Sequence, residues 1–135
     1  MTMQMTPEFM TLAGVLILAL VQILLAASAR TAELGLKWNA GPRDSETPAP
    51  GKLAGRLLRA QANLFETLPI FIAAILMAQM TARDGTGLTL IGSHLYLLGR
   101  LLYLPLYALG VAYIRSLAWI ASLVGLVMLI AALFV

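Results

Sequence analysis

The sequence has no cysteine, which excludes disulfides, thiol catalysis by the protein itself and cysteine-ligated metal sites. Histidine occurs once, at His94, and a single imidazole argues against a histidine-based metal site in one protomer, so we expect no metal. Charged residues make up only 11% of the chain, whereas 61% of it is hydrophobic. This balance excludes an ordinary soluble domain. No nucleic-acid motif and no interleaving of aromatic and basic residues is present, so we expect no nucleic-acid partner.

What the chain has instead is a series of long apolar runs. About 20 apolar residues in a helix cross the roughly 30 Å hydrocarbon core of a bilayer. The runs therefore predict an all-α, integral membrane four-helix bundle that occupies residues 1–135 as a single domain. No internal repeat is visible. The expected spans are about residues 9–29, 53–81, 88–112 and 117–135.

The basic residues predict how the bundle lies in the membrane. Six of the nine lysines and arginines fall between residues 30 and 59. The connection 30–52 is polar and rich in proline and glycine, and the positive-inside tendency places it in the cytoplasm. The N-terminus lacks a charged n-region and a cleavage site, so we expect the first run to be retained as a span. The chain is then a multi-pass protein of the inner (plasma) membrane, with both termini on the non-cytoplasmic side.

The second predicted span carries a polar stripe. Arg59, Asn63 and Glu66 are spaced i, i+4 and i+7, so they share one helix face. Ionisable groups in a membrane helix are costly, and function is the default hypothesis for them. The alternative is a polar network that only holds helices together.

The third span repeats this pattern with Arg100, Tyr103 and Tyr107 on one face. Counted at about 1.5 Å per residue, Glu66 and Arg100 lie at matching depth, about 20 Å in, so the sequence predicts that they pair. The two tyrosines could equally be ordinary core or interface aromatics. Arg115 is expected in a cytoplasmic turn at about residues 113–116, where it either serves the site or anchors the turn.

These residues carry a resemblance. The run Arg59-Ala60-Gln61-x-Asn63-x-x-Glu66, followed by Pro69, resembles the second-helix signature of the MAPEG family, the membrane-associated proteins of eicosanoid and glutathione metabolism. The pattern Arg100-x-x-Tyr103-x-x-x-Tyr107, the later Arg115, Arg30 at the end of the first span and the order of spans also resemble that family, in a member of bacterial type.

The resemblance implies a homotrimer that holds glutathione, as co-substrate, between neighbouring subunits near the cytosolic side. Arg115 would be the catalytic residue, because it would stabilise the thiolate of glutathione. One position departs from the pattern, since Thr67 stands where members that bind glutathione often have tyrosine. The glutathione-binding residues implied are Arg30, Arg59, Gln61, Asn63, Glu66, Arg100, Tyr103 and Tyr107.

The first functional hypothesis is a membrane glutathione transferase or peroxidase-like enzyme. Its lipophilic substrate would enter sideways from the bilayer lipid. The second hypothesis is a non-catalytic protein of the same fold that binds a lipid or a partner protein. A small transporter ranks last, because the paired halves typical of transporters are missing from the sequence.

Overall fold

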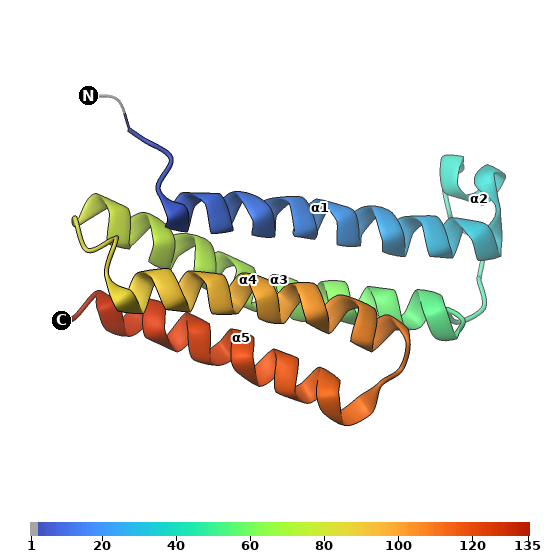
Figure 1. Cartoon of the computed structure of the whole chain (residues 1–135). Helices are drawn as coiled ribbons and strands as arrows, with labels where there is room; N and C mark the ends of the chain where they lie inside the picture. Colours follow the sequence, from blue (N-terminus) through green and yellow to red (C-terminus); the bar gives the residue numbers. More distant parts are fainter. Residues whose placement is uncertain (1–2) are drawn as a thin grey trace.

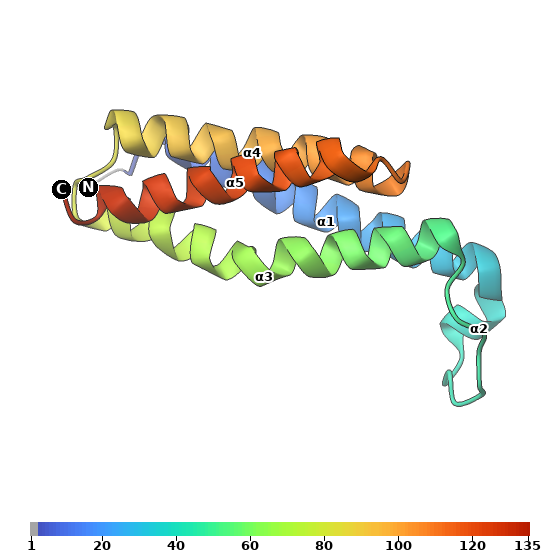
Figure 2. The ribbon, with the colours of Figure 1, turned by 90° about the horizontal axis from the view of Figure 1, so that it is seen from below.

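The computed structural model describes residues 3–135, which form five helices and no strand (Figure 1). Four of these helices are long and apolar enough to cross a membrane. They lie side by side, with the two ends of the chain at one end of the bundle and α2 at the other (Figures 1 and 2). The helices are α1 (Pro7–Leu34), α2 (Leu36–Ala40), α3 (Lys52–Met80), α4 (Gly87–Ala108) and α5 (Ala112–Ala132).

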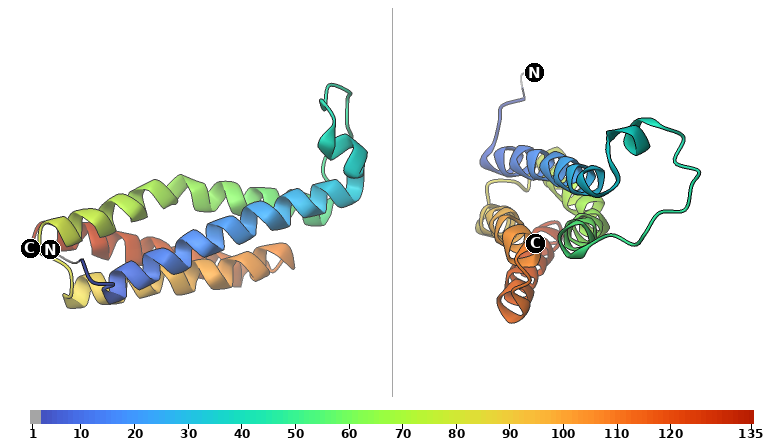
Figure 3. Two further views of the ribbon diagram at one scale, coloured as in Figure 1. Left: turned by 90° about the horizontal axis from the view of Figure 1, so that it is seen from above. Right: turned by 90° about the vertical axis from the view of Figure 1, so that its right-hand side faces the viewer.

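The first span is longer than its predicted range of 9–29. The side chain of Thr6 caps α1 by accepting from the Phe9 N–H, and Pro7 at the first helical position fits the free end of a helix. The helix continues to Leu34 and ends at Gly35, whose φ of 92° is a conformation that glycine adopts without strain. The segment that follows holds α2 and the connection to α3, and it swings out to the side of the bundle (Figure 3, right).

The connection between the third and fourth spans lies earlier than predicted. The predicted turn at residues 113–116 is wrong, because α4 ends at Ala108 and α5 has begun by Ala112. Gly110 adopts a φ of 75°, a left-handed conformation that ends α4 without strain. Arg115 therefore lies in the first turn of α5 rather than in a loop.

Helices α4 and α5 pack closely because glycines face each other. A Cβ added to Gly125 would lie 2.5 Å from the Gly92 carbonyl oxygen, and one added to Gly92 would lie 2.7 Å from that of Gly125. Small residues of this kind let membrane helices approach at the backbone. Helices α1 and α3 pack against this closely packed pair.

The core fills the centre of the bundle. Phe71 of α3 and Tyr96 of α4 stack with ring centroids 4.1 Å apart, and neither side chain is exposed. Near this point Pro69 interrupts the hydrogen bonding of α3, and the helix is visibly bowed (Figure 3, left). The buried residues of this cluster are Leu12, Val15, Ala19, Leu64, Phe71, Ala74, Ile75, Tyr96, Leu126 and Leu129.

A buried carboxylate closes the end of the bundle where the chain begins. Glu8, which is 1% exposed, accepts from the Gly85 N–H at 2.6 Å and from the Thr89 hydroxyl at 2.7 Å. Thr89 lies in the first turn of α4, where the helix dipole favours an anion, and Gly85 lies in the turn that precedes α4. Glu8 therefore ties the first turn of α1 to the turn between α3 and α4.

Candidate functional site

Three helices converge on Tyr107 near the end of α4. The Arg59 Nε of α3 donates to the Tyr107 hydroxyl at 3.0 Å. The Arg115 Cζ of α5 lies 4.5 Å from the centroid of the Tyr107 ring, within cation–π range. Arg59, Tyr107 and Arg115 are called the arginine–tyrosine cluster below. The structure thus brings together two residues that the sequence placed on separate helices and Arg115, which the sequence placed in a turn.

A second group surrounds Arg100, which is only 2% exposed. Its Nη1 donates to Asn63 Oδ1 at 2.6 Å and its Nη2 donates to Thr67 Oγ1 at 3.0 Å. The Thr67 hydroxyl in turn lies 2.8 Å from the Tyr96 hydroxyl. Asn63, Thr67, Tyr96 and Arg100 form a continuous hydrogen-bonded chain, called the buried arginine network below. It joins α3 to α4 at the depth of the polar stripe.

The predicted ion pair between Glu66 and Arg100 is wrong. Among residues 3–135, the one ion pair within 4.0 Å joins Arg30 to Glu33. The prediction compared only the depths of the two residues and took no account of rotation about the helix axis. A helix turns by about 100° per residue, so Asn63 and Thr67 flank one direction while Glu66 points to one side of it. Glu66 is exposed.

Tyr103 links the two groups. Its ring centroid is 5.4 Å from that of Tyr107, and the Arg100 Cζ lies 5.3 Å from the Tyr103 ring. Tyr103 itself is buried. The predicted stripe on α4 is therefore continuous, and it lies against the stripe of α3.

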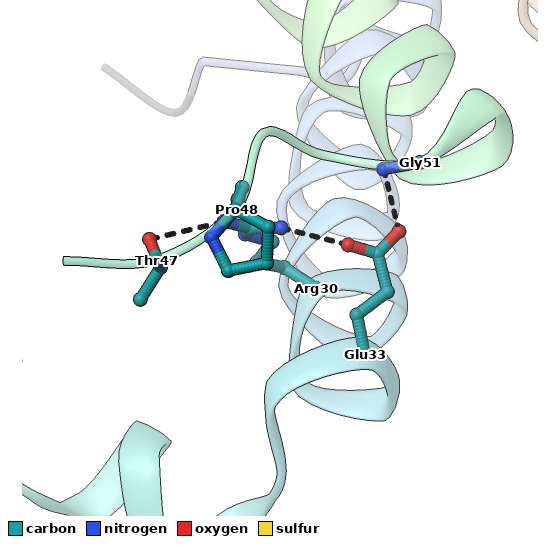
Figure 4. A network of polar contacts seen from close by, with 5 residues as sticks. All are labelled: Arg30, Glu33, Thr47, Pro48 and Gly51. Carbon is teal, nitrogen blue, oxygen red and sulfur yellow. Dashed lines mark hydrogen bonds and ion pairs between the residues drawn. The ribbon is translucent and has the colours of Figure 1, made fainter.

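Two of the predicted site residues lie elsewhere in the protomer. Arg30 pairs with Glu33 at 2.7 Å and donates to Thr47 Oγ1 and the Pro48 carbonyl of the loop (Figure 4). Glu33 completes this contact by accepting from the Gly51 N–H at 2.9 Å. Arg30 thus fastens the segment that precedes α3.

Gln61 lies on the other side of α3 from the polar stripe. It stands two residues from both Arg59 and Asn63, which corresponds to about 200° around the helix. Its side chain is half-buried. Within one protomer, Gln61 is therefore directed away from the arginine–tyrosine cluster.

The structure adds Tyr96 and Thr67 to the site. Tyr96 stands four residues before Arg100, so it extends the α4 stripe by one turn, and this spacing was a signal the sequence offered. Thr67 follows Asn63 by the same spacing on α3. Tyr96 was missed because a tyrosine in an apolar run is an ordinary packing residue. Thr67 was noted only as a departure from the family pattern, and its hydrogen bonds to Arg100 and Tyr96 give it another role.

The charges of the site call for an anion. Arg59, Arg100 and Arg115 gather around tyrosine rings, and no carboxylate of the described residues lies within 4.0 Å of any of them. Guanidinium groups bind carboxylates with bidentate geometry. The exposed Glu66 on the same face could accept an ammonium group. The arrangement therefore suits a small molecule that carries carboxylates together with an amine.

The comparison with known proteins agrees with a membrane-spanning helical bundle. The sequence model of the MAPEG family matches residues 11–135, which is nearly the whole chain. No curated protein matches the sequence. The match covers all four long helices from the second turn of α1 onward. The chain therefore belongs to the MAPEG family, and it is an integral, multi-pass membrane protein.

Proposed function

We propose that this protein binds glutathione at the arginine–tyrosine cluster and the buried arginine network, and uses its thiolate against lipophilic electrophiles. The observation that carries the proposal is the gathering of Arg59 and Arg115 on Tyr107 without a carboxylate partner. Glutathione brings two carboxylates and one ammonium group, which fits three guanidinium groups and one exposed glutamate. Family membership supports chemistry of this kind in general.

In the proposed reaction Arg115 lowers the pKa of the glutathione thiol, because a nearby cation favours the thiolate. Each unit of lowering requires about 1.4 kcal/mol of differential stabilisation. The sulfur forms a bond to the electrophilic carbon, the leaving group departs with its bonding electrons, and the thiol proton passes to water. With a lipid hydroperoxide, two glutathiones become the disulfide while the hydroperoxide becomes an alcohol and water.

The experiment measures thioether formation from a model electrophile by purified protein in detergent. We expect Arg115→Ala to lower kcat strongly while the binding of glutathione weakens less, because Arg115 acts on the thiolate. Arg115→Lys should keep part of the rate, since the charge remains. The matched control is Lys37→Ala, which removes an exposed cation of α2. Equal rates for the wild type and Arg115→Ala would remove Arg115 from the mechanism.

The oligomer is part of the proposal. We propose a homotrimer with the site between subunits, so that Arg30 and Gln61 reach the ligand from a neighbouring protomer. Arg30→Ala subunits mixed with Arg115→Ala subunits should then recover activity, because some sites combine two intact residues. Light scattering of the detergent-solubilised protein should give the mass of three chains. Recovery is not expected if each protomer holds a complete site.

A second function remains open because of Thr67. The Thr67 hydroxyl already bonds to Tyr96 and Arg100, so it has less capacity to hydrogen-bond a ligand than the hydroxyl of a tyrosine would have. Threonine also lacks an aromatic ring on which a ligand could stack. A non-catalytic protein of the same fold, which binds a lipid or a partner protein, is consistent with this. A titration separates the two functions, since glutathione binding with turnover supports the enzyme. Lipid binding without any affinity for glutathione supports the second function.

A further inference from the structure

We propose that Tyr96 is a positioning residue of the site, which acts through Thr67 and Arg100 to fix the orientation of the Asn63 amide. Tyr96 is fully buried, and its ring is stacked on Phe71 with an interplanar angle of 11°. The stack holds the phenol in one place in the core. This inference rests on the proposed function for the ligand that Asn63 meets, and on the hydrogen bonds alone for the orientation.

The hydroxyl of Thr67 is the first link. It has one proton to donate and two lone pairs that accept. Arg100 Nη2 uses one lone pair at 3.0 Å, and the Leu64 carbonyl, 3.3 Å away, takes the Thr67 proton. The remaining lone pair faces the Tyr96 hydroxyl at 2.8 Å, so Tyr96 is the donor. All three hydrogen-bonding positions of the Thr67 hydroxyl are then occupied, and this hydroxyl fixes the Nη2 end of Arg100.

Because Arg100 is fixed by Thr67, it fixes the orientation of the Asn63 side chain in turn. A guanidinium can only donate, so the Asn63 atom 2.6 Å from Nη1 must be the oxygen of its amide. The amide NH2 is thereby turned away from Arg100, and Asn63 is only partly buried. Asn63 consequently presents a donor to a ligand, which selects a carbonyl or carboxylate group at that point.

The amide can be observed directly because the chain has only two asparagines, Asn39 and Asn63. Selective labelling with 15N-asparagine gives two side-chain NH2 signals in an NMR spectrum of the detergent-solubilised protein. Asn39→Gln assigns them. Asn39 lies in α2, far along the chain from the network, and serves as an internal reference.

Two variants break the chain at different links. Tyr96→Phe removes one hydroxyl and keeps the ring that stacks on Phe71, whereas Thr67→Val removes the central hydroxyl at nearly constant volume. Both should shift or broaden the Asn63 signals and leave those of Asn39 in place. Thr67→Ser should restore the wild-type signals. The control is Ser93→Ala, because the Ser93 hydroxyl is fully buried in α4 but bonds only to the carbonyl of Leu90.

The same variants are then tested with glutathione. We expect KM for glutathione to rise by about two- to tenfold, as for the loss of one hydrogen bond, while kcat changes less. Unchanged Asn63 signals in both variants would overturn the inference. Shifted signals with an unchanged KM would also overturn the positioning role. If the wild-type protein fails to bind glutathione while the signals still shift, the orientation of Asn63 stands and the proposed function falls.

Discussion

Arg100 is a guanidinium inside a membrane protein whose partners are all uncharged. Its contacts are an amide, a hydroxyl and the rings of Tyr96 and Tyr103, and its Nε is buried without a hydrogen-bond partner. A buried charge is costly unless hydrogen bonds or charges and dipoles of the opposite sign compensate for it, and the face of an aromatic ring is one such negative group. The two aromatic rings provide part of this compensation. The hydrogen bonds to Asn63 and Thr67 provide the rest.

We expect Arg100→Lys to destabilise the protein. A lysine has no planar fork, so it can bond to Asn63 or to Thr67 but not to both with the same geometry. One partly buried acceptor is then left unsatisfied, and full burial of such a group would cost about 1–3 kcal/mol. The measurement is the midpoint of thermal unfolding in detergent, with Arg43→Lys in the exposed loop as the matched control. An unchanged midpoint for Arg100→Lys would mean that the network does not hold α3 to α4.

At the scale of the helices, two contacts hold the bundle together. One is the contact of Glu8 near one end of the bundle, and the other is the close approach of Gly92 to Gly125, called the glycine seam below. The backbones of α4 and α5 approach closely at Gly92 and Gly125, and this contact sets the distance between the two helices there. At the end of the bundle where the chain begins, Glu8 fixes the start of α1 against the start of α4. Both contacts lie outside the arginine–tyrosine cluster, in helices that carry it or pack against it.

The seam can be tested with Gly125→Ala. The added Cβ would lie 2.5 Å from the Gly92 carbonyl and 2.8 Å from the Tyr96 backbone nitrogen, so the helices must separate. Overpacking of this kind costs about 1–3 kcal/mol. Thermal unfolding should show a lower midpoint than that of the wild type. Gly87→Ala is the control, because nothing lies within 4 Å of a Cβ at the start of α4, and it should be close to neutral.

The hydrogen bonds of Glu8 can be tested in the same way. Glu8→Ala leaves the Gly85 N–H and the Thr89 hydroxyl without their acceptor, so the turn between α3 and α4 should open more often. Hydrogen exchange at residues 83–89 should become faster, while exchange at the far end of α3 stays the same. Asp84→Asn is the control within the same turn. Identical exchange for the wild type and Glu8→Ala would show that the carboxylate does not hold the turn.

At the scale of the whole molecule, the four spans place both described ends of the chain on one side and the α1–α3 connection on the other (Figure 1). The connection and the start of α3 carry most of the basic residues. Cytoplasmic loops are enriched in lysine and arginine, so we predict that the arginine–tyrosine cluster lies near the cytosolic leaflet.

This orientation can be measured because the chain has no cysteine of its own. A cysteine introduced by Ser45→Cys lies in the α1–α3 connection, and one introduced by Asp84→Cys lies in the turn between α3 and α4. An impermeant maleimide added to intact cells should label Asp84→Cys but leave Ser45→Cys unlabelled until the membrane is opened. The reverse pattern would place the site at the outer face and contradict the proposed orientation.

The sequence by itself determined the class of the protein, the four spans and the two polar stripes. Apolar runs of membrane length and residues at helical spacing are properties of a single segment, so they can be read without knowing any neighbour. The stripe of Arg59, Asn63 and Glu66 was visible in this way. The resemblance to the MAPEG family also rested on such local patterns.

The tertiary structure alone decided which side chains meet. The depth along a span is fixed by the sequence, but the rotation of one helix against another is fixed by packing, such as the approach of Gly92 to Gly125 and the stack of Phe71 on Tyr96. For this reason Arg100 bonds to Asn63 and Thr67 rather than to Glu66. Arg115 reaches Tyr107 from a helix rather than from a loop because α4 ends at Ala108 and α5 has begun by Ala112.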